Sequence, residues 1–414
     1  MAYRALDDRS LPGYLASFPD LTARLGPAAS SWTVKEVGDG NLNLVFLVDG
    51  PMGSICVKQA LPYMRLVGEG WPLPLSRSFF EHEALVEQAR HTPSLVPAVH
   101  HYDRELALIV MERLSPHVIM RKGLIAGTRY PRFARDVSEF LAANLFGTSD
   151  LAMPAAAKRA RAAVFAGNDV LCKISEDLIF TEPYLDAERN RWTRPHLDED
   201  ARRLREDGEL KCHVVELKRL FLDSAEALLH GDLHTGSIML TATDTRVIDP
   251  EFAFYGPMGF DVGAVLGNLF LAYFSQGGHA NGPAYAEWIL EQVGEVWRGF
   301  HDGFLARWNR GASGDGCADG FLDAAALRRT QSQTLARVLR DSLGFAGAKM
   351  IRRIVGLAHV LDLESIEDLA IRAACERRAL ALARRLVVQR ETLSLADAVA
   401  AARNVTLTVD TFTG

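Results

Sequence analysis

The stretch that decides the fold is His230-Gly231-Asp232-Leu233-His234-Thr235-Gly236-Ser237-Ile238-Met239-Leu240, followed by Val247-Ile248-Asp249-Pro250-Glu251. It places one carboxylate at Asp232 and two more, closely spaced, at Asp249 and Glu251. Phosphoryl transfer from a nucleotide needs one carboxylate that accepts or orients the proton of the attacking hydroxyl, and others that hold Mg²⁺ against the phosphates. The order and spacing therefore predict a catalytic loop at Asp232 and metal-binding carboxylates after it.

The residues between these carboxylates carry the pattern of a short hairpin. Ser237 to Leu240 is predicted as a strand, residues 241–245 as a turn and Arg246 to Ile248 as a second strand. A surface turn and an ordinary strand end are the alternative interpretation. The hairpin disfavours that alternative, because it presents carboxylates at both of its ends.

Composition and charge narrow the class of protein. The chain has 414 residues, enough for two lobes, and its net charge of −6 does not favour nucleic-acid binding. Its five cysteines are scattered without a metal-site spacing, which is typical of reduced thiols in a cytosolic protein. We see no secretory signal and no apolar run long enough to cross a membrane. The expectation is a cytoplasmic protein that binds neither membrane nor nucleic acid.

The first hundred residues predict a small β-sheet lobe. A helical segment up to about Leu25 precedes strands at 32–37, 44–48 and 54–59. Gly38 and Gly40 lie in the first turn, where backbone N–H groups would lie over phosphates. On their own these glycines indicate only a hairpin, and Lys58 on its own only a solvated lysine. Their order is similar to that of the first strands of a kinase small lobe.

The next segments complete this lobe. Residues 61–74 are expected to form an irregular loop that contains Trp71, and residues 76–89 a helix. One acid of that helix should pair with Lys58, with Glu81 as first choice and Glu83 as the alternative. Residues 106–112 read as a buried strand that leads to a hinge, where Met111, Glu112 and Leu114 would meet the adenine edge.

Helical periodicity dominates the rest of the chain. Expected helices cover residues 132–145, 211–229, 260–273 and 284–300, with several more up to Arg403. The fold class is therefore α+β and two-lobed, with a small antiparallel sheet lobe at 1–114 and a larger, mainly helical lobe at 115–414.

Several segments together resemble the 5-methylthioribose kinases, within the protein-kinase-like superfamily that includes aminoglycoside and choline kinases. The matching segments are Gly38 to Asn43, Val57 to Ala60, Gly68 to Leu73, Arg121 to Ile125, His230 to Met239, Asp249 to Glu251 running on to Leu269, and Lys349 to His359. The resemblance implies ATP-dependent phosphorylation of the 1-hydroxyl of 5-methylthioribose in methionine salvage, with Mg²⁺ and as a homodimer.

The resemblance also implies roles for individual residues. Asp232 would be the catalytic residue, and Asp249 and Glu251 would bind the metal. Substrate would be bound by Trp71, Asp232, Arg352 and Arg353. ATP would be bound by Gly38, Gly40, Asn41, Asn43, Lys58, Glu81, Met111, Glu112 and Leu114.

Some positions have alternative interpretations. Ser237 stands where protein kinases carry a metal-binding Asn, and Glu251 can supply the missing oxygen ligand. Asp261 is expected to accept backbone N–H groups of the catalytic loop and His230 to pack in that loop, while His234 stays outside the catalytic set. Adjacent arginines on a helix are usually solvated, but Arg352 and Arg353 lie between apolar pairs, so at least one should face a cleft.

Two other functions remain open at this point. One is a kinase of another alcohol, such as an aminoglycoside or choline. The other is a pseudokinase that binds nucleotide without turnover, which the intact carboxylates disfavour.

Overall fold

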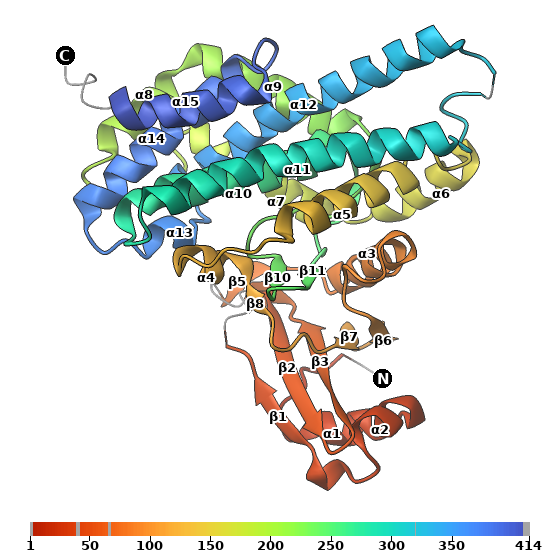
Figure 1. The fold of residues 1–414 in the computed structure, drawn as a ribbon. Coiled ribbons are helices and arrows are strands. Elements are labelled where there is room, and N and C mark those ends of the chain that lie inside the picture. The colour runs from red at the N-terminus through yellow and green to blue at the C-terminus, as the bar shows by residue number, and fades with distance from the viewer. Residues whose placement is uncertain (1–2, 39–41, 65–67, 319, 409–414) are drawn as a thin grey trace.

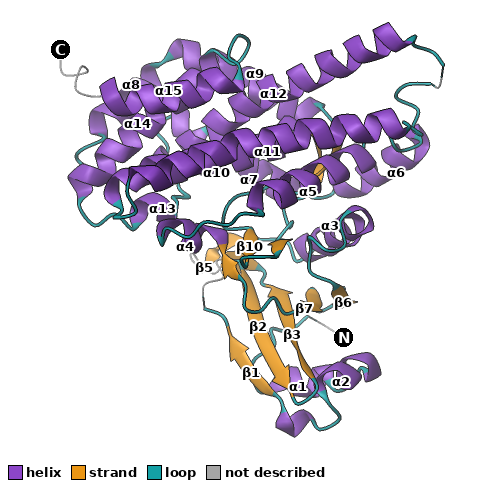
Figure 2. Cartoon of the chain, in the orientation of Figure 1, coloured by secondary structure: helices purple, strands orange, loops and turns teal. Residues whose placement is uncertain are grey.

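The computed structural model describes residues 3–38, 42–64, 68–318 and 320–408 (Figure 1). Gly40 and Asn41, which were predicted to bind ATP, lie outside the described residues. The chain forms a small lobe built on a sheet and a larger helical lobe, as Figure 2 shows by secondary structure. The predicted two-lobed α+β fold is therefore confirmed.

The small lobe is built on a five-stranded antiparallel sheet with the order β1-β2-β3-β7-β6. Its strands are β1 (Thr33–Glu36), β2 (Asn43–Gly50), β3 (Gly53–Ala60), β6 (Val99–Asp103) and β7 (Leu108–Glu112). Helices α1 (Ser10–Leu15) and α2 (Pro19–Leu25) pack their leucines against one face, where Phe46 and Val57 are buried. Because side chains alternate along a strand, Lys58 points to the opposite face, toward the large lobe.

The segment between β3 and the following helix is more regular than expected. We predicted an irregular loop over residues 61–74, but β4 (Tyr63–Met64) pairs antiparallel with β5 (Gly68–Pro72). Helix α3 (Arg77–His91) follows and matches the predicted helix to within two residues at its end. Trp71 therefore lies at the end of a strand, close to the start of α3.

Short strands lie where the two lobes meet. Strand β10 (Ile238–Leu240) pairs with β11 (Thr245–Val247), as the predicted hairpin requires, and also with β8 (Val118–Ile119). A separate pair joins β9 (Ala227–Leu229) to β12 (Phe254–Gly256). The expectation of a helix over 211–229 was wrong at its end, because the helix stops at Asp223 and an apolar strand follows.

The large lobe is helical. Its helices are α4 (Met120–Ile125), α5 (Phe133–Gly147), α6 (Ala155–Phe165), α7 (Asp169–Phe180), α8 (Asp198–Glu206), α9 (Gly208–Asp223), α10 (Gly259–Ser275), α11 (Pro283–Arg310), α12 (Ala324–Val355), α13 (Leu361–Glu364), α14 (Leu369–Val388) and α15 (Leu395–Thr408). Every residue of α10 is buried, which makes it the central helix of the lobe.

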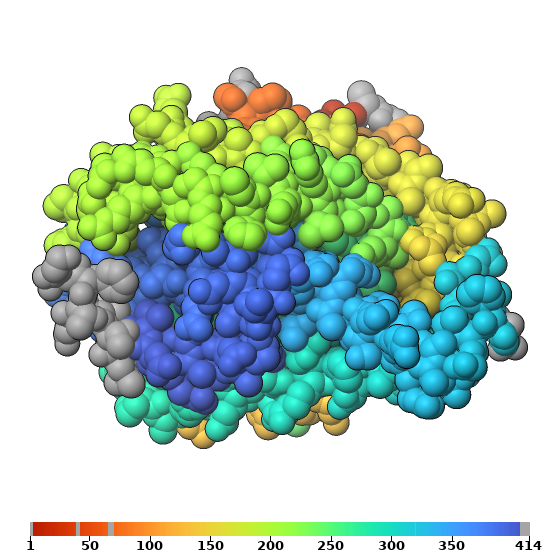
Figure 3. All heavy atoms as spheres, turned by 90° about the horizontal axis from the view of Figure 1, so that it is seen from above, coloured from red at the N-terminus to blue at the C-terminus, as the bar shows by residue number. Residues whose placement is uncertain are grey.

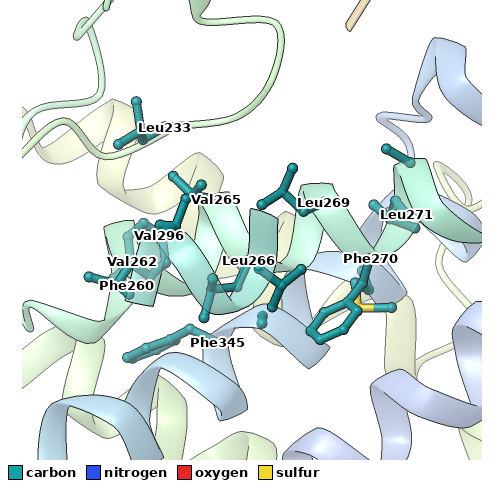
Figure 4. Packing of buried hydrophobic residues seen from close by; sticks show 14 of the residues in the cluster. Leu233, Phe260, Val262, Val265, Leu266, Leu269, Phe270, Leu271, Val296 and Phe345 are labelled. Atoms are coloured by element: carbon teal, nitrogen blue, oxygen red, sulfur yellow. The ribbon is translucent and has the colours of Figure 1, made fainter. Parts of the chain in front are cut away.

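Helix α12 packs closely on α10, and this contact positions the site. A Cβ on Gly263 would lie 2.4 Å from the Ser342 carbonyl oxygen, so glycine is needed for this approach. The rings of Phe260 and Phe345 meet edge to face at 5.3 Å in the same layer (Figure 4). The packing fixes the C-terminal half of α12 relative to the catalytic loop.

The face of the large lobe remote from the small lobe is formed by segments far apart in sequence. Residues of α8 and α9 lie beside the C-terminal helices there (Figure 3). Arg377 pairs with Asp200, and Arg384 pairs with Asp207. Within the described ranges, the helices include none whose length and apolar character would suit a membrane span.

Candidate active site

The catalytic loop follows β9 and is held by a buried aspartate of α10. Asp261 Oδ2 accepts a hydrogen bond from the His230 backbone N–H at 2.6 Å, and Oδ1 accepts one from Gly231 at 3.1 Å. His230 Nε2 donates to the carbonyl of Ile248 at 2.8 Å. The expected roles of Asp261 and His230 in shaping the loop are confirmed.

Gly231 makes the turn into Asp232 possible. Its φ is +85°, and a Cβ there would lie 2.1 Å from the Phe252 carbonyl oxygen. We expect Gly231→Ala to destabilise the protein by more than the roughly 1–2 kcal/mol that a left-handed conformation costs an L-residue, because the clash adds to the strain. Thermal melting of both proteins measures this, and an unchanged Tm would contradict it.

Asp232 lies among basic side chains. Its Oδ1 is 3.7 Å from Arg352 Nη1 and 3.8 Å from Lys349 Nζ. Its Oδ2 is 3.7 Å from Arg353 Nη2 and 3.4 Å from His234 Nε2. Both arginines come from the last turns of α12 and are buried, so both face the catalytic loop. The expectation that at least one would face inward is confirmed.

These charges keep Asp232 ionised. Burial alone would raise the pKa of Asp232, but the neighbouring positive charges hold it well below its usual value. Burial also drives the pKa of His234 well below its usual value, so that ring is neutral at neutral pH. A charged His234 would have the largest lowering influence on the pKa of Asp232, and with that ring neutral the charges of Arg353, Arg352 and Lys349 keep the pKa low. A carboxylate with a lowered pKa is ionised at neutral pH, so it can accept a hydrogen bond from a hydroxyl group.

Lys349 was missed by the sequence reasoning as a site residue. It lies one turn before the arginine pair on α12, within a run of small and apolar residues. A single lysine within a run of small and apolar residues could have indicated a buried, functional side chain. Arg353, by comparison, is anchored by a hydrogen bond that it donates to the Ala358 carbonyl oxygen at 3.3 Å.

A second group of carboxylates faces the small lobe. Oxygen atoms of Glu81, Asp249 and Glu251 lie within 4.8 Å of one another. Lys58 Nζ is 2.8 Å from Glu81 Oε1 and also contacts Asp249. The choice of Glu81 over Glu83 as the partner of Lys58 is confirmed, because Glu83 pairs with Arg161 instead.

The two predicted metal-binding residues differ in their surroundings. Asp249 has φ +69°, and its side chain is 43% exposed, whereas that of Glu251 is 3% exposed. Asn43 Nδ2 donates to Glu251 Oε2 at 3.0 Å, and Arg77 Nε lies 3.4 Å from the same oxygen. Ser237, in contrast, directs its hydroxyl to the Asp232 carbonyl oxygen at 3.1 Å.

Arg77 was also missed, and it connects several segments. It is fully buried and donates to the carbonyl oxygens of Leu61, Pro74 and Leu42 and to Asn43 Oδ1, at 2.7–3.0 Å. It therefore ties both ends of the β4–β5 hairpin to the turn before β2. Nothing in the local sequence distinguishes Arg77 from a solvated arginine at a helix start.

The carboxylate group suits a hard cation. Burial raises the pKa of Glu81 and of Glu251, and the neighbouring carboxylates add to the effect. Burial would lower the pKa of Lys58, but Asp249, Glu81 and Glu251 raise it. Three carboxylates thus face two basic side chains, Lys58 and Arg77, so the group favours uptake of a proton or cation. Oxygen donors of this kind are those that Mg²⁺ prefers.

The predicted hinge residues lie at the end of β7. Met111 pairs with Cys56 of β3, and the Glu112 backbone N–H donates to the Ala98 carbonyl oxygen at 2.8 Å. The Glu112 side chain also accepts from Arg246 at 3.0 Å. Leu114 is half-buried just beyond the strand, and Gly38 lies in the turn after β1. Their contact with ATP stays a prediction.

Trp71 faces a cavity beside α7. Arg189 lies over its ring, 4.6 Å from the centroid, and both line this cavity, which has a volume of about 490 Å³. Among the described residues, the lining of this cavity includes neither Asp232 nor the arginine pair. The role of Trp71 in binding substrate stays a prediction.

Comparison with known proteins is consistent with this geometry. Residues 33–299 match the phosphotransferase enzyme family. Methylthioribose kinase 1 of Oryza sativa subsp. japonica is 48% identical over 393 residues, which cover 93% of this chain and 91% of that protein. Methylthioribose kinase of Escherichia coli O45:K1 is 49% identical over 404 residues, which cover 96% of each.

A solved choline kinase from Cryptosporidium parvum aligns with 95% of this chain and all of its own, at 12% identity and a TM-score of 0.47. The family match spans more than half of the chain, and the two relatives are almost half identical along nearly all of it. The chain therefore belongs to the phosphotransferase enzyme family and, within it, to the methylthioribose kinases.

Proposed function

We propose that this chain transfers the γ-phosphoryl group of ATP to the 1-hydroxyl of 5-methylthioribose, giving 5-methylthioribose 1-phosphate and ADP in methionine salvage. The observation that carries the proposal is that the basic groups of Lys349, Arg352 and Arg353 all lie within 4 Å of the Asp232 carboxylate. The acceptor sugar is inferred from the names of the relatives, and phosphoryl transfer is inferred from the geometry of the site. We further propose a homodimer, as the family resemblance implies, and a cytoplasmic location, for which the scattered cysteines are typical.

The basic surroundings of Asp232 favour this acceptor over a cationic one. Three basic side chains lie within 4 Å of the carboxylate. An aminoglycoside or choline would bring further positive charge into this group, and like charges there cost free energy. A neutral sugar with hydroxyl groups can instead accept hydrogen bonds from the two guanidinium groups.

In the proposed mechanism Asp232 accepts a hydrogen bond from the 1-hydroxyl and orients its oxygen toward the γ-phosphorus. The attacking bond forms as the bond to the ADP oxygen breaks, and the hydroxyl proton passes to Asp232. Arg352 and Arg353 stabilise charge on the phosphoryl group in transit. Lys58, which pairs with Glu81, would meet the other phosphates of ATP.

Asp249 and Glu251 would hold Mg²⁺, for which their oxygens are suitable donors. When bound, the ion would neutralise negative charge on the phosphate groups of ATP. Asn43 and Arg77 hold one oxygen of Glu251, the Oε2 atom, at 3.0 and 3.4 Å. Lys58 can release Asp249 when phosphates replace that carboxylate as its partner.

Replacing Glu251 with Gln is expected to raise the Mg²⁺ concentration needed for half-maximal activity, because a neutral amide donates less charge to a hard cation. Mg²⁺ titrations of activity and calorimetric titration of the ADP complex both measure the change. Ser237→Ala is the matched control, since its hydroxyl is directed to the Asp232 backbone. An unchanged Mg²⁺ requirement in Glu251→Gln, with activity abolished in Ser237→Ala, would reverse the metal assignment.

An ATP-consumption screen tests the proposed function. 5-Methylthioribose is compared with ribose, choline and an aminoglycoside, and ³¹P NMR identifies the phosphorylated position. We expect turnover to be fastest with 5-methylthioribose and the product to carry phosphate at the anomeric carbon. If choline or an aminoglycoside is turned over faster, the proposed acceptor is wrong. If nucleotide binds but no acceptor is turned over, the protein is a pseudokinase.

A further inference from the structure

Lys349 has an unusual position for a lysine. Its side chain is only 4% exposed, and its ammonium group has no hydrogen-bond partner among the described residues. The nitrogen lies 3.8 Å from Asp232 Oδ1 and 3.8 Å from the centroid of the Phe260 ring. A buried ammonium without a hydrogen bond costs free energy, so its retention at this place needs an explanation.

We propose that Lys349 is a positioning residue, which holds the Asp232 carboxylate in place for the attacking hydroxyl. The effect of Lys349 on catalysis rests on the proposed function. The contact between Lys349 and Asp232 does not depend on it. Phe260 supports the ammonium from α10, while Asp232 meets it from the catalytic loop. Lys349 therefore acts on the substrate only through Asp232.

The charges around Lys349 come from several elements. Asp232 and His234 belong to the catalytic loop, and Asp261 belongs to α10. Arg352 and Arg353 follow on α12 itself. On the next helix, α14, the atoms that meet α12 beside Gly347 are apolar or backbone atoms of Ala383, Leu386 and Val387. Burial is the largest influence, and it lowers the pKa of Lys349 to about 8.

This environment gives the proposal a distinct pH dependence. The ammonium is charged below its pKa and neutral above it, so its hold on Asp232 weakens as the pH rises through about 8. Since kcat/KM reports groups of the free enzyme, we expect it to fall on the alkaline side in the wild type. Lys349→Arg keeps the charge and should move that fall to higher pH.

Kinetics with Lys349→Met provide the first test. We expect kcat/KM for 5-methylthioribose to fall by about 10- to 100-fold, because a misplaced catalytic group costs that much. The alkaline fall should disappear, and KM for ATP should change little. Lys158→Met is the matched control, because Lys158 of α6 is also a buried lysine, 8% exposed, and pairs with Asp150. A loss no larger than in that control, or an unchanged alkaline fall, would overturn the proposal.

NMR of the whole protein labelled with ¹³C and ¹⁵N in lysine provides a second test that needs no turnover. The Lys349 signal is assigned by its absence in Lys349→Arg. We expect it to titrate near pH 8 in the wild type and at lower pH in Asp232→Asn, since the carboxylate stabilises the charged form. An identical titration in both proteins would overturn the proposal even if Lys349→Met does not fold. If the wild type fails to phosphorylate the sugar while this titration behaves as expected, only the proposed function is wrong.

Discussion

Asp232→Asn is expected to lower kcat by roughly 10²- to 10⁴-fold, the usual contribution of a positioned proton acceptor. The amide is nearly isosteric, so the loop held by Asp261 should keep its shape. It cannot accept the hydroxyl proton, and it presents an N–H group to three basic neighbours. Single-turnover kinetics with saturating ATP measure the chemical step directly.

The control for this experiment is a change of the same kind far from the site. Asp302 is exposed on α11 and contacts His301, so Asp302→Asn should have near wild-type kinetics. Binding of ATP to Asp232→Asn, followed by calorimetry, should change little, because Lys58 and the carboxylates near it are untouched. Near-normal turnover in Asp232→Asn would remove Asp232 from the mechanism.

The arginine pair is expected to have an effect of comparable or larger size. Arg352→Ala and Arg353→Ala should each lower kcat/KM for 5-methylthioribose, by up to the roughly 10³- to 10⁵-fold that an arginine on a transferring phosphoryl group contributes. Burial lowers the pKa of both, but a guanidinium remains charged at neutral pH. Lysine should not restore activity, since it lacks the planar fork of donors.

Helix α12 supplies a matched control for the pair. Arg328 and Arg329 are also adjacent on this helix, but they are exposed near its start. Alanine at these positions should leave sugar kinetics unchanged, while circular dichroism checks that every variant is folded. Unaltered sugar kinetics in both Arg352→Ala and Arg353→Ala would leave the choice of acceptor resting on similarity to relatives.

The sequence predicted those parts of the structure that are determined by residues close together in the chain. The β10–β11 hairpin, with Asp232 before it and Asp249 after it, follows from a turn between two short strands. Lys58 could be placed because it ends an apolar strand and has acids of α3 in reach. The apolar run before His230 fits a helix end and a buried strand equally well, which is why β9 was taken as part of α9.

The parts that sequence could not supply depend on contacts between distant segments. Lys349 reaches Asp232 only because α12 packs closely on α10. Arg77 is buried only because the β4–β5 hairpin and the turn before β2 both direct carbonyl oxygens at it. The contact of Trp71 with Arg189 likewise joins segments that lie far apart in the sequence.

Arg77 limits how the acceptor specificity of this scaffold can be redesigned. A new β4–β5 hairpin, grafted from another kinase to admit a larger alcohol, would have to present carbonyl oxygens where Leu61 and Pro74 now present theirs. Without them the guanidinium would lose partners in a place that water does not reach. Arg77 contacts Asn43, and Asn43 contacts Glu251, so the displaced guanidinium would also move Glu251. A graft intended to change the sugar would therefore first change the Mg²⁺ concentration that activity requires.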